Sequence, residues 1–160
     1  MARGQKPVTC KSRWLWRPDR AAGSVFAVEN SSSLADRQID RVLRSLAHWC
    51  PYNKLQIEIR ASSCPYGAWV TPATRHLLIY MGQPNEFPYL DDFTPRISWG
   101  RVATRPQALA GLLAHEFWHL RQYRQGRPLS ELSADLAAVH ALTCWRNGVR
   151  RRIPLYTVSG

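Results

Sequence analysis

Two histidines four residues apart enclose a glutamate in the sequence His115-Glu116-Phe117-Trp118-His119. Residues at this spacing on an α-helix lie on the same face, so both imidazoles can bind a single metal ion. Glu116 lies on the same flank of the helix, where its carboxylate can accept a proton from a metal-bound water. The pattern therefore predicts a zinc-dependent hydrolase, with His115 and His119 as ligands and Glu116 as the catalytic base.

The neighbouring residues predict the helix that this pattern needs. Thr104 and Gln107 form a T-x-x-Q capping box, and Pro106 lies in the first turn, where a missing N–H is not needed. One amphipathic helix is predicted from about Gln107 to Arg124, and a glycine and a proline follow it as stop signals. The apolar stripe of this helix recurs at steps of three and four residues, at Leu109, Leu112, Leu113, Phe117 and Leu120.

A catalytic zinc ion usually takes three protein ligands, so one more must come from elsewhere in the chain. The segment from Ser130 to Leu142 is predicted to form a second helix, with Ser130 as its N-cap. Glu131 can supply the third ligand, and Asp135 can accept the outward N–H of a zinc-bound imidazole and fix its tautomer. His140 is the alternative ligand, about 180° around the helix from Glu131, so the two cannot bind the same ion. Asp135 as the sole carboxylate ligand is the least favoured alternative.

The HEFWH sequence of residues 115–119, followed by the ELSAD sequence of residues 131–135, resembles the gluzincin pattern of HExxH and then ExxxD. That pattern is found in thermolysin-like peptidases and in short ImmA/IrrE-type intracellular peptidases. The resemblance covers residues 105–145 and implies Glu131 as a zinc ligand and Asp135 as the residue that supports the ligands. The interval between His119 and Glu131 is shorter than in thermolysin-like enzymes, so a minimal single-domain gluzincin is the better comparison.

The rest of the chain predicts an α+β fold in a single domain of residues 1–160, with residues 1–30 and 148–160 peripheral. We expect an irregular or weakly stranded start to about residue 30, and then a helix from Leu34 to Trp49. A strand is expected from Leu55 to Arg60, and a hairpin over residues 68–81. The zincin resemblance implies a small antiparallel or mixed sheet behind the site helix, with an edge strand that can receive an extended peptide.

The segment between Gly82 and Ala103 is rich in proline and aromatic residues. It is predicted to be a functional loop, unless residues 96–103 form one more strand. Its aromatic side chains either line a substrate cleft or cap one end of the core, and they are Phe87, Tyr89, Phe93 and Trp99.

The expected reaction is hydrolysis of a peptide bond. A water bound to zinc has its pKa lowered to about 7, and Glu116 would accept its proton and later pass it to the leaving amine. A donor beside the metal would stabilise the oxyanion, and Tyr123, one turn beyond His119, or His140 could supply it. The substrate would be a peptide or a protein. An enzyme that cleaves one particular protein would show no activity in assays with a general protein substrate.

The chain carries 22 Lys and Arg against 11 Asp and Glu, which gives a net charge of +11. Such a surface attracts polyanions. Two alternative functions follow: a nucleic-acid-associated protease in the manner of SprT-type enzymes, and a non-catalytic module that binds zinc or nucleic acid. The explanation we favour for the charge is an arginine preference of a GC-rich genome together with solvated helix faces.

The four cysteines, Cys10, Cys50, Cys64 and Cys144, form no C-x-x-C pair, which argues against a zinc ribbon. The basic start leads into no continuous apolar segment, so a secretory signal is not expected. No apolar run approaches the length of a membrane span. We therefore expect a cytoplasmic protein whose cysteines are buried or free thiols.

Overall fold

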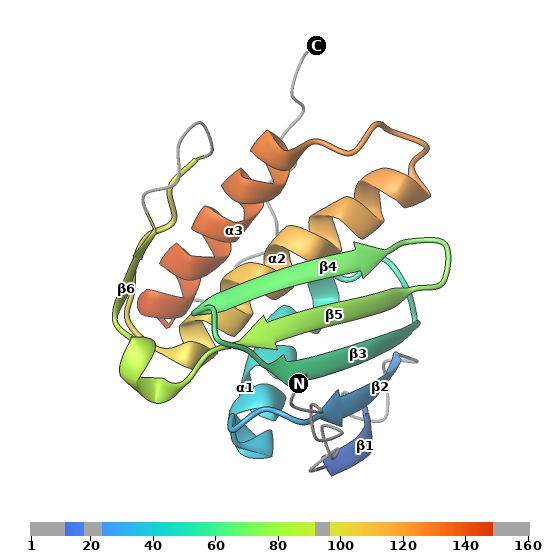
Figure 1. The fold of residues 1–160 in the computed structure, drawn as a ribbon. Helices are drawn as coiled ribbons and strands as arrows, with labels where there is room; N and C mark the ends of the chain where they lie inside the picture. The colour runs from blue at the N-terminus through green and yellow to red at the C-terminus, as the bar shows by residue number, and fades with distance from the viewer. Residues whose placement is uncertain (1–11, 18–23, 92–96, 149–160) are drawn as a thin grey trace, which may run out of the picture.

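A mixed sheet of five strands supports the rest of the fold (Figure 1). The computed structural model describes residues 12–17, 24–91 and 97–148. In spatial order the strands are β1 (Ser12–Trp16), β2 (Val25–Asn30), β3 (Lys54–Ala61), β5 (His76–Met81) and β4 (Tyr66–Thr71). β2, β3 and β5 run parallel to one another, and the two edge strands run antiparallel to their neighbours. Together with three α-helices in the described segments, this sheet confirms the α+β prediction.

Alternating side chains give the sheet one apolar face. In β3, Leu55, Ile57 and Ile59 are buried. Lys54, before Leu55, and Gln56, between Leu55 and Ile57, are exposed. β5 has the same period, with alternate residues buried, as a half-buried strand requires. β4 and β5 pair as the predicted hairpin. Helices α1 and α2 lie together on the apolar side of the sheet (Figure 1).

Helix α1 (Asp36–Leu46) connects β2 to β3, because two parallel strands need a crossover connection. It is shorter than the expected helix of residues 34–49: Ala35 is its N-cap, and the short 3₁₀ helix η1 (Ala47–Trp49) follows it. Its buried residues recur at steps of three and four and form one apolar stripe, and they are Ile39, Val42, Leu43 and Leu46.

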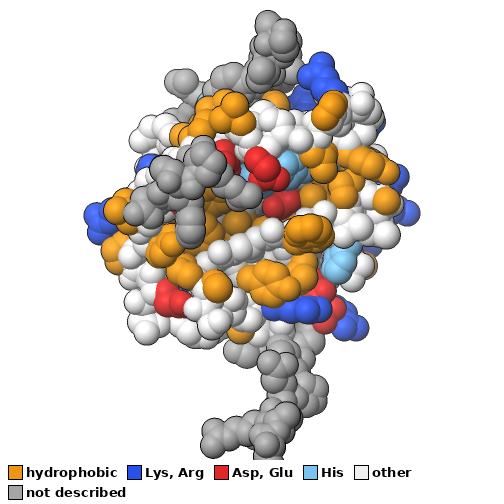
Figure 2. All heavy atoms as spheres, turned by 45° about the horizontal axis from the view of Figure 1, so that its top comes forward, with side chains coloured by type: hydrophobic (Ala, Val, Ile, Leu, Met, Phe, Trp, Pro, Cys, Tyr) orange, Lys and Arg blue, Asp and Glu red, His pale blue; other side chains and the backbone are white. Residues whose placement is uncertain are grey.

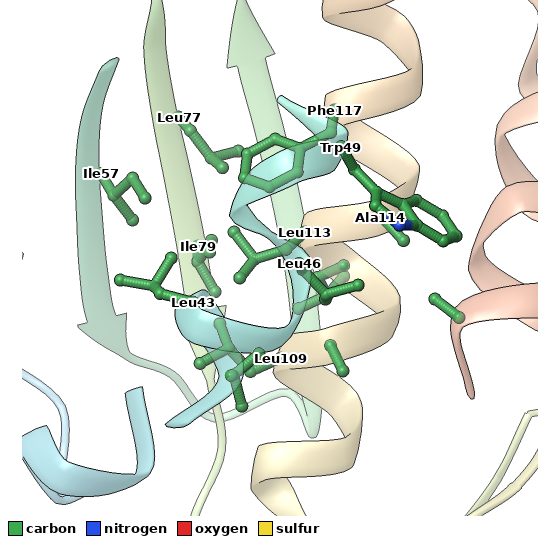
Figure 3. Close-up of a cluster of buried hydrophobic side chains, with 14 of the residues drawn as sticks. Leu43, Leu46, Trp49, Ile57, Leu77, Ile79, Leu109, Leu113, Ala114 and Phe117 are labelled. Atoms are coloured by element: carbon green, nitrogen blue, oxygen red, sulfur yellow. The ribbon is translucent and has the colours of Figure 1, made fainter. Parts of the chain in front are cut away.

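Helix α2 (Arg105–Arg124) carries the HExxH sequence and is buried on all sides from Gln107 to Leu120. The prediction of an amphipathic helix was therefore wrong. One face of α2 packs on the sheet and α1, where Leu109, Leu113 and Phe117 meet the residues drawn in Figure 3. The opposite face packs on α3 (Glu131–Arg146), and small residues allow this close approach. No helix in the described segments is long and apolar enough to cross a membrane.

The start of α2 differs in one detail from the predicted capping box. The Thr104 side chain accepts a hydrogen bond from the Gln107 backbone N–H at 3.3 Å, as expected of an N-cap. The Gln107 side chain reaches one residue further back and accepts from the Ala103 N–H at 2.6 Å. The helix start is thus fixed by the two predicted side chains.

Residues 12–16 and 25–30 are not peripheral, which corrects the expectation for this part of residues 1–30. β1 and β2 belong to the sheet, and Phe26 and Val28 are fully buried in the core. Trp16 stacks on Phe26 at 5.2 Å between ring centroids, and its indole N–H donates to Asp40 Oδ1 on α1 at 3.0 Å. The outer parts of the regions expected to be peripheral, residues 1–11 and 149–160, lie outside the described residues.

The described part of residues 82–103 forms a second, small sheet. It contains the 3₁₀ helix η2 (Pro84–Glu86) and the antiparallel strands β6 (Tyr89–Asp91) and β7 (Gly100–Val102). β7 is the additional strand that the sequence left open as an alternative. Phe93 lies outside the described residues.

Candidate metal centre

His115, His119 and Glu131 come together between α2 and the first turn of α3. The two histidine Nε2 atoms lie 3.1 Å apart. Glu131 places Oε2 at 3.2 Å from His115 Nε2 and Oε1 at 3.2 Å from His119 Nε2. Among the described residues, this is the one cluster of three His, Cys, Asp or Glu side chains whose ligand atoms are close enough to hold a metal ion.

A tight turn after α2 brings Glu131 to the two histidines. Gly126 has a positive φ of 66°, and the N–H groups of Gly126 and Arg127 donate to Tyr123 O at 3.0 Å and Gln122 O at 2.9 Å. These two bonds form a Schellman motif, which ends the helix and reverses the chain. Ser130 then caps α3, because its side chain accepts from the Ser133 N–H at 3.3 Å.

A buried polar network holds the start of α3 against α2. Ser133 Oγ accepts from Trp118 Nε1 at 3.0 Å and from Gln122 Nε2 at 2.9 Å, and it donates to the Ser130 carbonyl at 3.1 Å. Gln122 Oε1 in turn accepts from the Ser130 N–H at 3.2 Å. These bonds fix the helix end that carries Glu131. Sequence reasoning missed Trp118, Gln122 and Ser133, although Gln122 stands three residues after His119 and so on the same face of the helix.

The partners of the outward ring nitrogens define the tautomers of the two histidines. His119 Nδ1 lies 3.2 Å from Gln122 Oε1, an acceptor, so it carries the proton. His115 Nδ1 lies 3.1 Å from Asp135 Oδ1, so the predicted contact of Asp135 with a candidate ligand imidazole is made by His115. In the tautomer with both Nδ1 atoms protonated, each Nε2 atom would present a lone pair to a shared metal ion.

The cluster fits a zinc ion. A cation between the two Nε2 atoms and the carboxylate, which lie 3.1–3.2 Å from one another, would be attracted by all three groups. Ligands bonded at zinc's usual lengths and tetrahedral angles would be about 3.3 Å apart, close to these separations. Nitrogen and carboxylate ligands of this kind suit zinc, and three of them leave one position of a tetrahedral ion for water.

Trp99 connects the loop of residues 82–103 to this site. Its indole N–H donates to Asp135 Oδ1 at 3.3 Å, and its ring centroid lies 6.2 Å from that of His115. The Trp99 ring also stacks on Tyr66, with centroids 5.5 Å apart and planes 5° from parallel. Trp99 therefore positions Asp135, which in turn contacts His115.

Gly111, one turn before His115, leaves room for Trp99. A Cβ atom at this position would lie 2.9 Å from Trp99 Cζ3, closer than carbon atoms approach in proteins. A glycine inside a helix weakens it by about 1 kcal/mol relative to alanine, so a packing reason is needed to explain one. This contact is that reason, and the glycine is the sequence signal that could have indicated it.

The aromatic residues of the same loop cap the end of the core beside the site. Tyr66 contacts Phe87 at 6.3 Å and Tyr89 at 5.4 Å between ring centroids. Burial, with a smaller contribution from Asp91, raises the pKa of the Tyr66 hydroxyl above its ordinary value. Figure 2 shows histidine and acidic side chains together in a hollow of the surface, with hydrophobic side chains on either side.

The remaining predicted residues occupy different surroundings. Glu116 is buried on α2 between the two histidines in sequence, with 5% of its surface exposed. Tyr123, one turn beyond His119, is 48% exposed. His140 stacks on Trp49 at 5.9 Å between centroids, and its Nε2 lies 3.6 Å from Cys144 Sγ, so it is not a member of the metal-binding cluster.

No cysteine among the described residues belongs to this cluster. Cys50, Cys64 and Cys144 are free thiols, as expected, whereas Cys10 lies outside the described residues. Burial raises the pKa of the Cys50 thiol to about 11, so it stays protonated at neutral pH. A protonated thiol is a poor nucleophile and a poor metal ligand.

No protein-family model matches this chain, and no curated protein sequence matches it. The gluzincin resemblance therefore remains a prediction that rests on residues 115–119 and 131–135. The geometry of these residues is the basis for the functional proposal.

Proposed function

We propose that this protein is a zinc-dependent peptidase whose metal ligands are His115, His119 and Glu131. The observation that carries the proposal is the convergence of two imidazole Nε2 atoms and one carboxylate, with Nε2–Nε2 and Nε2–O distances of 3.1–3.2 Å. A buried carboxylate, Glu116, follows His115 directly. This combination of ligands and base is what metal-assisted hydrolysis of an amide requires.

A bound zinc ion would acidify a water and polarise the scissile carbonyl. Glu116 is the group on this chain that would hold the proton of that water and deliver it to the leaving amine. Asp135, 3.1 Å from His115 Nδ1, and Gln122, 3.2 Å from His119 Nδ1, would keep the two imidazoles in the tautomer that presents Nε2 to the metal. Tyr123 and His140 stay candidates for oxyanion stabilisation, with Tyr123 favoured because His140 contacts Trp49 instead.

An extended peptide or an unfolded protein segment is the substrate class that the fold favours. β4 is an edge strand, and within the described residues it pairs on one side only, with β5. It is the strand of the sheet with the most extensive approach to α2, the helix of the histidines (Figure 1). A peptide could add to this edge as a further strand and so bring its backbone to the metal site.

The test is the substitution Glu116→Gln, assayed against a peptide library with mass-spectrometric detection of products. The amide cannot accept a proton, so we expect hydrolysis to fall by about 100-fold or more while one zinc per chain is retained. Glu29→Gln is the matched control, because Glu29 lies on β2 and pairs with Arg13. Undiminished cleavage by Glu116→Gln would refute the assigned role of Glu116. A zinc-loaded wild type that cleaves no peptide or protein would favour a non-catalytic zinc module.

A further inference from the structure

The sheet face opposite the helices carries a depression that the candidate peptidase site does not use. Its volume is about 570 Å³, and it lies at the end of the sheet where β2 and β3 begin. Leu15, Val25 and Ala27 provide apolar surface to it, and Gln56 and Thr74 provide an amide and a hydroxyl. Apolar surface with a few polar groups is typical of ligand sites of this size.

Three cationic side chains line this depression, and they come from three separate segments. Arg17 follows β1, Lys54 begins β3, and Arg75 precedes β5. The sheet brings Lys54 and Arg75 to the same end of β3: Val25 of β2 pairs with Lys54, and the Gln56 N–H of β3 donates to Arg75 O at 3.0 Å. The depression thus collects positive charge that is dispersed in the sequence.

This positive charge is not compensated within the described residues. No Asp or Glu is among the described residues that line the depression. Arg17, Lys54 and Arg75 form no ion pair with another described side chain, in contrast to Arg60 on the same sheet, which pairs with Glu58 at 2.6 Å. An unpaired cluster of this kind attracts an anionic ligand.

The basic surface continues from the depression to the end of α2. Arg75 lies over the Tyr52 ring at 4.5 Å, and Arg124 lies over the same ring at 5.9 Å. The Arg124 side chain also donates to the Pro51 carbonyl, which holds it there. The charge therefore extends along the molecule, which suits a chain-like polyanion better than a small anion.

We propose that this depression binds single-stranded nucleic acid, with phosphates on the three cations and a base on the apolar surface. Arginine matches phosphate geometry, and guanidinium planes and apolar patches accept unstacked bases. A duplex would present its bases stacked and could not fill a depression. The net charge of +11 would strengthen such binding. This proposal does not depend on the metal centre.

The experiment is fluorescence anisotropy with labelled 20-nucleotide oligo-dT and oligo-U at several salt concentrations. We expect Arg17→Glu and Lys54→Glu each to weaken binding by about 10-fold or more. Each should also reduce the slope of log K against log salt by about 0.7 for every phosphate that the variant no longer binds. Arg37→Glu on α1 is the control, because it makes the same charge change on an exposed residue of the opposite side and should alter affinity less than about threefold.

Three results would overturn the proposal. One is an equal loss of affinity in Arg37→Glu, which would mean that net charge alone matters. Another is equally tight binding of poly-glutamate, and the third is binding of phosphatidylserine vesicles without binding of oligonucleotides. Lys54→Glu should leave peptide hydrolysis unchanged, and Glu116→Gln should leave oligonucleotide binding unchanged, so the two functions can fail separately. Circular dichroism of each variant checks that it is folded.

Discussion

Glu131 differs from the other two candidate ligands because its side chain is half exposed, whereas both histidines are buried. Its carboxylate oxygens nevertheless lie 3.2 Å from both Nε2 atoms. Catalytic zinc ions usually have three protein ligands, so removal of the third ligand is expected to lower the affinity of the site for zinc. Glu131 is thus the residue at which the metal proposal is most directly tested.

We expect Glu131→Ala to lose bound zinc and His140→Ala to keep about one zinc per chain. The reason is that His140 lies against Trp49 and not with the ligand atoms. Elemental analysis of both purified variants beside the wild type measures this. Loss of zinc in His140→Ala with retention in Glu131→Ala would reverse the assignment.

Gln122 tests whether the outward hydrogen bond of His119 matters. Gln122→Met keeps the size of the side chain but removes the acceptor 3.2 Å from His119 Nδ1 and the bond to Ser133. Loss of such a supporting residue typically weakens metal binding by about 10- to 100-fold. Competition with a chelator measures the affinity. Gln125→Met, at the exposed end of α2, is the control and should bind zinc like the wild type.

Among the elements, α2 carries the largest structural constraint, because it packs between the sheet and α3. Gly111→Ala would place a methyl group 2.9 Å from Trp99. Ordinarily this change favours a helix, but here we expect a net loss of about 1–3 kcal/mol in the free energy of unfolding from overpacking. Urea denaturation measures it. Gly67→Ala in β4, where no atom lies within 4 Å of the new methyl group, should be much milder.

Local patterns predicted the elements that depend on neighbouring residues. The alternation around Ile57, the β4–β5 hairpin and the capped start of α2 were all readable from the sequence. The pairing of β1 and β2 was not, because the segment that contains them is short and lacks a long alternating run. The burial of α2 on all sides was missed because small residues such as Ala114 give no strong pattern.

The site shows the same limit. HExxH and the ExxxD that follows it identified the three clustered residues and Asp135 by spacing alone. Trp99 is 36 residues from Asp135 in the sequence and reaches it only through the fold. The hydrogen bond from Gln122 to Ser133 connects two different helices, α2 and α3. Interactions of this kind depend on tertiary packing, which no local pattern encodes.

At the scale of the whole molecule, the metal ion would bind two helices to each other. A ligand that binds only the folded state stabilises it by about 2.7 kcal/mol at a concentration one hundred times its dissociation constant. We therefore expect EDTA to lower the melting temperature of the wild type by several degrees, and to have little effect on Glu131→Ala. Differential scanning calorimetry measures both. An identical shift in the two proteins would show that the chelator acts elsewhere.

The Schellman turn after α2 keeps all the candidate ligands within one stretch of chain, residues 115–131. Closing so short a loop costs little entropy, whereas the sheet must bring together strands that are far apart in sequence. The metal site is therefore expected to form early in folding, as a helical hairpin that precedes the completed sheet. An ion bound at that stage would act as a template for folding before it serves any chemistry.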